Sequence, residues 1–97
     1  MTDTDIQQAL SILELTAKRK RILEHVSRKH GFCPDDLTTK HRHKELTRAR
    51  QEAMYRLRKE LPLSYPRIAR IVGRSDHTTV MHGIKRHCER FGLEVPK

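Results

Sequence analysis

The chain has 97 residues, which leaves room for one small domain with a modest core, so an enzyme built around a large catalytic cavity is not expected. Lysine and arginine number 21 against 12 acidic residues, and the formal net charge is +9 with histidine neutral. This excess favours a polyanionic partner, with nucleic acid as the leading candidate. A basic helix lying on an anionic membrane is disfavoured, because such helices bury Trp, Phe and Leu, and the chain has no Trp and two Phe.

The first residues carry neither a basic segment nor an apolar run, and no stretch approaches ~18 continuous apolar residues. Neither a secretory signal nor a membrane span is therefore expected, and a cytoplasmic location, at the nucleoid, is predicted. The two cysteines, Cys33 and Cys88, are interpreted as small buried thiols of a reducing compartment rather than as a disulfide.

An apolar stripe marks residues 1–21 as an N-terminal helix. Its members recur at spacings of three and four and are Ile6, Leu10, Leu13 and Ala17. A basic run follows at 18–21, and a second apolar set at 22–26 continues to a stop at Gly31, so one long helix or two abutting helices are predicted. The stripe either folds back on the domain's own core or pairs with a second copy in a homodimer. Folding back is favoured, because a small domain must conserve apolar area.

The middle of the chain predicts a turn, a loop and a helix. Residues 34–37, starting at a proline, predict one capped helical turn, and the polar, strongly basic segment 38–46 predicts a loop. Thr47 is expected to be the N-cap of the next helix, which Pro62 ends. The buried stripe of that helix is predicted to include Met54, Leu57 and Leu61.

Residues 64–86 predict two short helices around a tight turn. The first helix has a clustered apolar side, formed by Leu63, Ile68, Ile71 and Val72. Gly73 follows where a left-handed residue would end the helix, and Asp76 is placed to accept from the N–H of Thr78 or Thr79 as the N-cap of the second. The second helix is expected to continue to Phe91.

The polar face of this second helix carries hydroxyls and imidazoles near its start and cations farther along. These residues are His77, Thr78, Thr79, His82, Lys85 and Arg86. In a helix-turn-helix the first residues of the second helix meet base edges, while flanking cations hold phosphates. The alternative is an ordinary amphipathic hairpin with a solvated polar face.

Several segments together resemble the C-terminal DNA-binding domain of the bacterial replication initiator DnaA. They are Arg48-Ala49-Arg50-Gln51, Ala53-Met54-Tyr55, Leu63-Ser64-Tyr65-Pro66-Arg67-Ile68 and Asp76-His77-Thr78-Thr79-Val80-Met81-His82. The resemblance runs from about Ile22 to His87 and implies an all-α helix-turn-helix domain, which we assign to residues 22–97. It also implies binding to duplex DNA at short DnaA boxes, with the Asp-His-Thr-Thr signature in the major groove.

The resemblance and the residue chemistry together give a set of candidate contacts. Base contacts are assigned to Arg42, Arg50, Asp76, His77, Thr78 and Thr79, and phosphate contacts to Lys40, Lys44, Arg48, Arg58, Ser64, Arg67 and Lys85. By position Arg42 matches the arginine with which the family enters the minor groove, whereas a generic basic loop would touch phosphates alone. Asp76 is expected both to cap the helix and to accept from a base amine.

Two features depart from the initiator. No phosphate-cradling Gly-x-x-x-x-Gly-Lys-Ser/Thr run is present among the four glycines, so no bound nucleotide and no ATPase of that type are expected. The turn also reads Gly73-Arg74-Ser75-Asp76 where the family usually has Gly-Gly-Arg-Asp, which puts the usual turn contact of the arginine, and the preferred box, in question.

Other functions are weaker from the residues alone. Seven histidines invite a metal site, but no Cys-x-x-Cys or His-Glu-x-x-His spacing is present, so no metal or other cofactor is predicted. A cysteine nucleophile would need a shaped pocket that so small a chain can scarcely build, and no enzyme activity is expected. The predicted role is sequence-specific DNA binding in transcriptional regulation or control of replication initiation. The alternatives are a sequence-blind nucleoid protein and an adaptor for an acidic protein.

Overall fold

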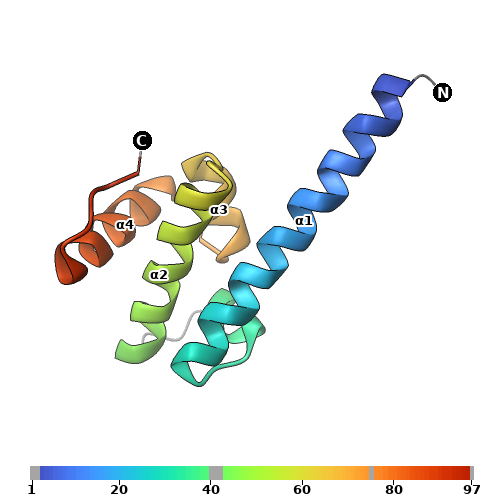
Figure 1. The fold of residues 1–97 in the computed structure, drawn as a ribbon. Coiled ribbons are helices and arrows are strands. Elements are labelled where there is room, and N and C mark those ends of the chain that lie inside the picture. Colours follow the sequence, from blue (N-terminus) through green and yellow to red (C-terminus); the bar gives the residue numbers. More distant parts are fainter. Residues whose placement is uncertain (1–2, 40–42, 75, 97) are drawn as a thin grey trace.

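The computed structural model describes the backbone of residues 3–39, 43–74 and 76–96, and the side chains of these ranges from residue 11 onward. Within them the chain forms four α-helices and one 3-10 helix, with no strand (Figure 1). The elements are α1 (Asp3–His30), η1 (Pro34–Thr38), α2 (Lys44–Glu60), α3 (Tyr65–Ile71) and α4 (His77–Phe91). The predicted all-α helix-turn-helix fold is confirmed.

Helix α1 is one continuous helix whose first half leaves the rest of the protein (Figure 1). Leu13 is 66% exposed and Ala17 is also exposed, so the prediction that this stripe folds back on the core is wrong for the described side chains. The physical reason lies in the sequence of residues 3–30, which contains no glycine or proline to break the helix and turn it back. The basic run at 18–21 continues the helix.

The second half of α1 packs on the domain. Ile22 and Val26 are buried, and Leu15 and Leu23 pack partly buried against the same core. Helix α2 lies between α1 and α4 and contacts both (Figure 1). Every residue of α2 from Ala49 to Tyr55 is buried, so the helix is covered on more than one side. The predicted Met54 and Leu57 are buried, whereas the predicted Leu61 is only half-buried.

Helix α2 begins earlier than the sequence indicates. It starts at Lys44, so the predicted loop through residue 46 and the predicted N-cap at Thr47 are wrong. His43 is the N-cap residue, and the Thr47 N–H already donates to the His43 carbonyl at 2.8 Å. Leu46 is buried in the core, and this tertiary contact draws the first turn of α2 into the helix. The helix ends at Glu60, before Pro62 as predicted.

The short predicted turn at 34–37 is confirmed as η1, whose Leu37 is fully buried. Cys33 precedes it as the N-cap and Cys88 lies in the core of α4, and both are free thiols. The prediction of two buried thiols holds for Cys88 and is wrong for Cys33, which is exposed because the start of η1 lies at the surface.

Candidate nucleic-acid interface

The turn between α3 and α4 is closed by backbone hydrogen bonds around Gly73. The Gly73 N–H donates to the Arg70 carbonyl at 3.2 Å and the Arg74 N–H to the Ala69 carbonyl at 2.7 Å, the pattern of a Schellman motif. Gly73 has φ +70°, as the sequence predicts for a residue that ends a helix in the left-handed conformation. Ile68 and Val72 are fully buried beneath this turn, so the α3–α4 helix-turn-helix is anchored to the core.

Asp76 begins α4 as its N-cap. Its Oδ1 accepts from the Thr78 N–H at 2.8 Å, which confirms the predicted cap. Hydrogen bonding from the backbone and the side chain of Thr78, together with the nearby His77, holds the pKa of the Asp76 carboxyl below its ordinary value. An ionised carboxylate therefore stands at the start of α4, where it also interacts well with the helix dipole.

The residues predicted to read bases lie together at this helix start. Asp76, His77, Thr78 and Thr79 are all exposed, while Val80 directly after them is fully buried. The helix is thus held by its apolar side with its first turn open to a ligand. This arrangement presents two methyls, two hydroxyls, an imidazole and a carboxylate to the same space.

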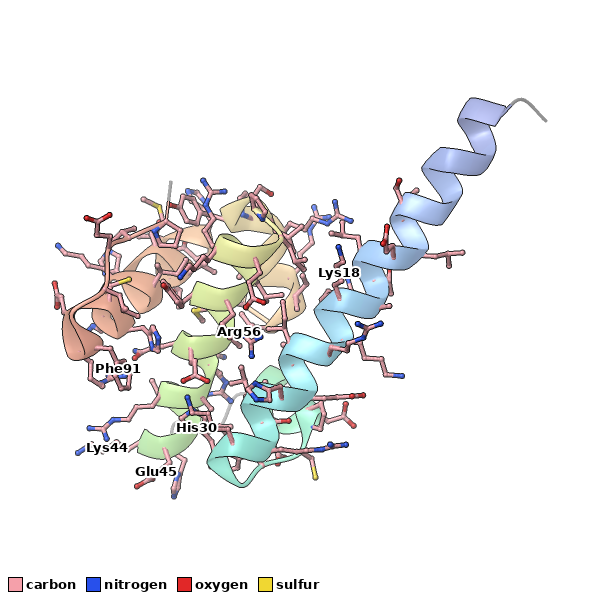
Figure 2. All side chains as sticks on the ribbon, viewed as in Figure 1. Lys18, His30, Lys44, Glu45, Arg56 and Phe91 are labelled. Atoms are coloured by element: carbon pink, nitrogen blue, oxygen red, sulfur yellow. The ribbon has the colours of Figure 1, made fainter. Side chains whose placement is uncertain are left out.

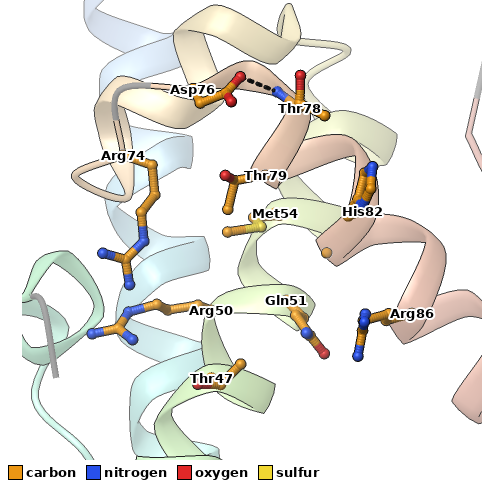
Figure 3. Close-up of a pocket in the computed structure, with 11 residues that line it drawn as sticks. Thr47, Arg50, Gln51, Met54, Arg74, Asp76, Thr78, Thr79, His82 and Arg86 are labelled. Carbon is orange, nitrogen blue, oxygen red and sulfur yellow. Dashed lines mark hydrogen bonds between the residues drawn. The ribbon is translucent and has the colours of Figure 1, made fainter. Parts of the chain in front are cut away.

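An open groove of about 410 Å³ runs from this helix start along the junction of α2 and α4 (Figure 3). It is lined by Thr47, Arg50, Gln51, Met54, Arg74, Asp76, Thr78, Thr79, His82, Gly83 and Arg86. Figure 3 shows Arg50 and Arg74 on one side of the groove and His82 and Arg86 on the other. Arginines therefore stand on both sides of the groove, and Asp76, Thr78 and Thr79 at the start of α4 belong to its lining.

Close packing of α2 against α4 forms the floor of the groove. A Cβ added to Gly83 would stand 2.6 Å from the Met54 sulfur, so the two helices approach as closely as a glycine permits. Above this crossing Gln51 is buried and its Oε1 accepts from Arg90 at 3.1 Å. The groove walls are thus fixed by packing before any ligand enters.

Arg50 occupies a different place from the other predicted base contacts. Its side chain is only 2% exposed, and its guanidinium donates to the backbone carbonyls of Leu37 at 2.9 Å, Asp36 at 3.3 Å and Thr39 at 2.5 Å. Burial and the nearby charge of Arg74 lower its pKa. Arg50 therefore ties α2 to the end of η1. A base contact by Arg50 stays a prediction, and it would require the guanidinium to leave these carbonyls.

Most of the residues predicted to contact phosphate have exposed side chains, whereas Arg58 is hydrogen-bonded within the domain. Those with exposed side chains are Lys44, Arg48, Ser64, Arg67 and Lys85. Arg58 is half-buried, donates to the Leu63 carbonyl at 2.8 Å and lies 4.5 Å from the centre of the Tyr65 ring. It joins α2 to the start of α3. The Ser64 hydroxyl caps α3 by accepting from the Arg67 N–H at 3.4 Å. Lys40 and Arg42 lie outside the described residues.

Comparison with known proteins identifies the family. Residues 19–86 match the family described as the bacterial DnaA protein helix-turn-helix. The chain belongs to this family. Over 76 residues it is 39% identical to the chromosomal replication initiator protein DnaA of Picosynechococcus sp., which covers 78% of the chain and 16% of that protein. No solved structure matches the chain.

Other DnaA relatives agree in extent. The chain is 38% identical over 73 residues to the chromosomal replication initiator protein DnaA of Thermus thermophilus, covering 75% of the chain and 17% of the relative. It is 36% identical over 92 residues to that of Chloroflexus aggregans, covering 90% of the chain and 18% of the relative. The chain therefore spans less than a fifth of the length of these DnaA proteins.

Seven residues that line the groove of this DnaA-type domain were not assigned as contacts from the sequence: Thr47, Gln51, Met54, Arg74, His82, Gly83 and Arg86. His82 and Arg86 were placed on the polar face of the second helix without an assigned contact. Thr47 and Gln51 are four residues apart on α2, which marks one helix face, but nothing local indicates that this face opens toward α4. Arg74 was left in question because of the altered turn. Its half-buried side chain extends from the turn into the groove toward Arg50 (Figure 3).

Two further findings concern the DnaA-type domain as a whole. Among the described residues, no group of three or more histidine, cysteine or acidic side chains is arranged to hold a metal ion. Within the same ranges, none of the helices has the length and apolar character needed to cross a bilayer.

Proposed function

We propose that this chain binds double-stranded DNA sequence-specifically, with the start of α4 in the major groove. The observation that carries the proposal is the open first turn of α4, where Asp76, His77, Thr78 and Thr79 are exposed in front of a fully buried Val80. A helix-turn-helix presents base-reading residues at this position. Threonine methyls suit the thymine methyl, and hydroxyls and carboxylates suit base amines.

The surrounding charge supports the same proposal. Arg74 and Arg86 line the groove beside the first turn of α4. Lys44 and Arg48 are exposed on α2, and Lys85 is exposed farther along α4. Cations of this kind neutralise phosphates and fix the register of a protein on DNA without reading sequence. The basic segment at 40–42 is proposed to add a minor-groove contact through Arg42.

The name of the relatives suggests the biological setting. The relatives are chromosomal replication initiator proteins, so the proposed targets are DnaA-box-like sites and the proposed role is control of replication initiation or transcription there. The proposed function is binding without catalysis and without a nucleotide or other cofactor. A protein of this kind would act in the cytoplasm, at the nucleoid.

Selection of bound sites from random duplexes tests this function. A recurrent short asymmetric box is expected, and binding to it should weaken with salt by about −0.9 in log affinity against log salt for each phosphate contact. Enrichment of A/T-rich shape alone, with no recurrent box, would favour a sequence-blind coating protein. Binding to DNA that hardly changes between low and physiological salt would contradict both and leave the adaptor as the alternative.

A further inference from the structure

The outward side of α1 carries an apolar face that the domain cannot cover. Leu13 and Ile22 are nine residues apart, which is two and a half turns at about 3.6 residues per turn, so they lie on opposite faces. Ile22 is 4% exposed and Leu13 is 66% exposed. At Leu13 and Ala17, whose side chains are described, this face of the helix therefore points away from the core, and the backbone of α1 continues outward from there (Figure 1).

This face is self-complementary in its spacing. Its register positions are Ile6, Leu10, Leu13 and Ala17, and the steps between them are four, three and four residues, the same from either end. Alternating steps of three and four form the seam of packed helix pairs. A second α1 running in the opposite direction would set Leu10 against the partner's Leu13 and Ile6 against the partner's Ala17.

Charge selects this antiparallel direction. Residues 1–17 carry three acids and no cation, and the next four residues are all cations, Lys18 to Arg21. Asp3 lies three residues before Ile6, the first position of the apolar face, and Arg21 lies four residues after Ala17, the last position. An antiparallel partner brings its acidic end beside these cations, whereas a parallel partner stacks one basic run on the other.

A groove lies beside the basic end of α1, on the side that faces α2. This groove of about 530 Å³ is lined by Lys18, Arg21, Ile22, His25, Arg56, Glu60 and Leu61, and Figure 2 shows Lys18 and Arg56 on the facing sides of α1 and α2. The Arg56 Nη1 lies 2.7 Å from the His25 Nδ1. Arg56 is also ion-paired with Glu60, which compensates its charge, so the cations available to an acidic helix end are those of residues 18–21.

We propose that two copies of this chain associate through an antiparallel pair of α1 helices along the seam of Ile6, Leu10, Leu13 and Ala17. The seam is about 27 Å long from residue 3 to residue 21. It is small beside standard stable interfaces, so association in the micromolar to millimolar range is expected. The two helix-turn-helix domains then lie at opposite ends of the paired α1 helices, and the start of α4 stays exposed in each.

Sedimentation across protein concentration, without DNA, tests the association. The wild-type chain should show a reversible monomer–dimer equilibrium, and Leu13→Glu should weaken it at least about tenfold. Ile12→Glu is the matched control, because Ile12 is 63% exposed but lies about 100° around the helix from Leu13. A wild-type chain that stays monomeric up to about 1 mM, or equal weakening by the two variants, would overturn the proposal; circular dichroism verifies that each variant is folded.

Cysteine cross-linking tests the direction. In a Cys33→Ser background, which leaves only the buried Cys88, chains carrying Ile6→Cys or Ala17→Cys are oxidised separately and as a mixture. The antiparallel seam predicts cross-links in the mixture and few in either variant alone, because identical positions are then about 16 Å apart along the seam. Efficient cross-linking of the Ile6→Cys chain with itself would overturn the antiparallel arrangement.

Discussion

Gly73 in the helix-turn-helix turn lies directly against the carbonyl of Thr38 at the end of η1. A Cβ added to Gly73 would stand 2.5 Å from the Thr38 oxygen, closer than atoms of this kind can approach. Arg50 reinforces the junction by donating to the neighbouring Thr39 carbonyl. The turn that precedes the reading helix and the segment that precedes the basic residues 40–42 are therefore fixed to each other. This coupling holds Thr38 and Thr39 in place beside the turn that precedes α4.

Gly73→Ala should destabilise the fold by at least about 2 kcal/mol, because a left-handed alanine costs about 1–2 kcal/mol and the clash with Thr38 adds to it. Gly92→Ala is the matched control: Gly92 has φ +65° at the end of α4, with nothing within 4 Å of the added Cβ, so it should lose only the conformational part. Urea denaturation measures both. Equal losses would mean that the contact with Thr38 contributes nothing.

Arg50→Lys should lower both stability and sequence preference. Lysine keeps the charge but carries its donors on a single nitrogen and lacks the planar fork with which Arg50 donates from Nε and Nη2, so a loss of about 1–3 kcal/mol in unfolding free energy is expected. If Arg50 acts by positioning the segment after η1, which carries Arg42, the Arg50→Lys variant should lose discrimination at the same base pairs as the Arg42→Ala variant. A loss at a base pair that Arg42→Ala leaves unchanged would instead indicate a direct base contact by Arg50.

His87 is a buried imidazole between two aromatic rings. Its ring centre lies 4.9 Å from that of Tyr55 and 4.8 Å from that of Phe91, and its Nδ1 has no hydrogen-bond partner among the described residues. Burial lowers the pKa of His87, against the opposite effect of the Glu52 carboxylate, and the charge of Arg90 lowers it further. The folded protein therefore keeps this imidazole neutral at pH values where an unfolded chain begins to protonate.

The stability of the protein should therefore fall with acidification. Below about pH 6.5 the unfolded state binds a proton at His87 that the folded state does not, so the free energy of unfolding decreases until the lower folded pKa is passed. His87→Leu should flatten this decrease, and it should cost little stability at pH 8, because it removes a buried unpaired nitrogen. His82→Gln changes an exposed histidine of the same helix and should retain the slope. Denaturation at pH 5 to 8 measures all three proteins, and an unchanged slope in His87→Leu would contradict the assignment.

The α3–turn–α4 segment was predictable from sequence because the residues that determine it lie close together in the chain. Gly73 ends one helix, Asp76 caps the next, and the apolar spacing agrees with both, so each residue indicates the same fold. The start of α2 was not predictable, because Leu46 draws the first turn into the helix through a contact with the distant core. Spacing likewise predicted an apolar face on α1 but could not say what covers it.

The groove shows the same limit at the site. Thr47 and Gln51 line the same groove as Arg74 and Arg86 because α2 packs against α4 at Gly83. How two helices cross depends on the side chains of both, so neither segment alone predicts it. Arg50 has the residue type and position of a base contact, yet its guanidinium is held by carbonyls of η1. The type of a residue indicates which groups its side chain can bind, whereas the fold determines which of those groups lie within reach.

Arg42 and Lys44 should respond differently to the sequence of the site. Arg42→Ala is expected to weaken binding most where the minor groove is A/T-rich, because a narrow groove concentrates negative potential around an inserted arginine. Lys44, exposed at the start of α2, should contact phosphate alone, so Lys44→Ala should weaken all duplexes about equally. Affinities on paired A/T-rich and G/C-substituted duplexes separate the two. Equal, sequence-blind losses would remove the minor-groove role of Arg42.

Thr78 and Thr79 should carry base discrimination without carrying affinity for phosphate. Both are exposed and uncharged at the start of α4, so Thr→Ala at either should change binding to a scrambled duplex little and reduce discrimination by about 1–3 kcal/mol at one base pair. His77→Ala should act likewise. The Thr78→Ala, Thr79→Ala double variant should therefore bind the selected and scrambled sites with nearly the same affinity.

Asp76 needs a separate variant in that experiment, because its carboxylate also accepts the capping hydrogen bond from the Thr78 N–H. Asp76→Asn keeps an acceptor for the cap while removing the charge and changing the group that faces a base, so a change in site preference with only a small fall in melting temperature is the expected result. Binding titrations on the selected and scrambled duplexes measure the threonine and aspartate variants together. If the double threonine variant kept the full preference for the selected site, another element would be reading the sequence and α4 would serve only to hold the domain on DNA.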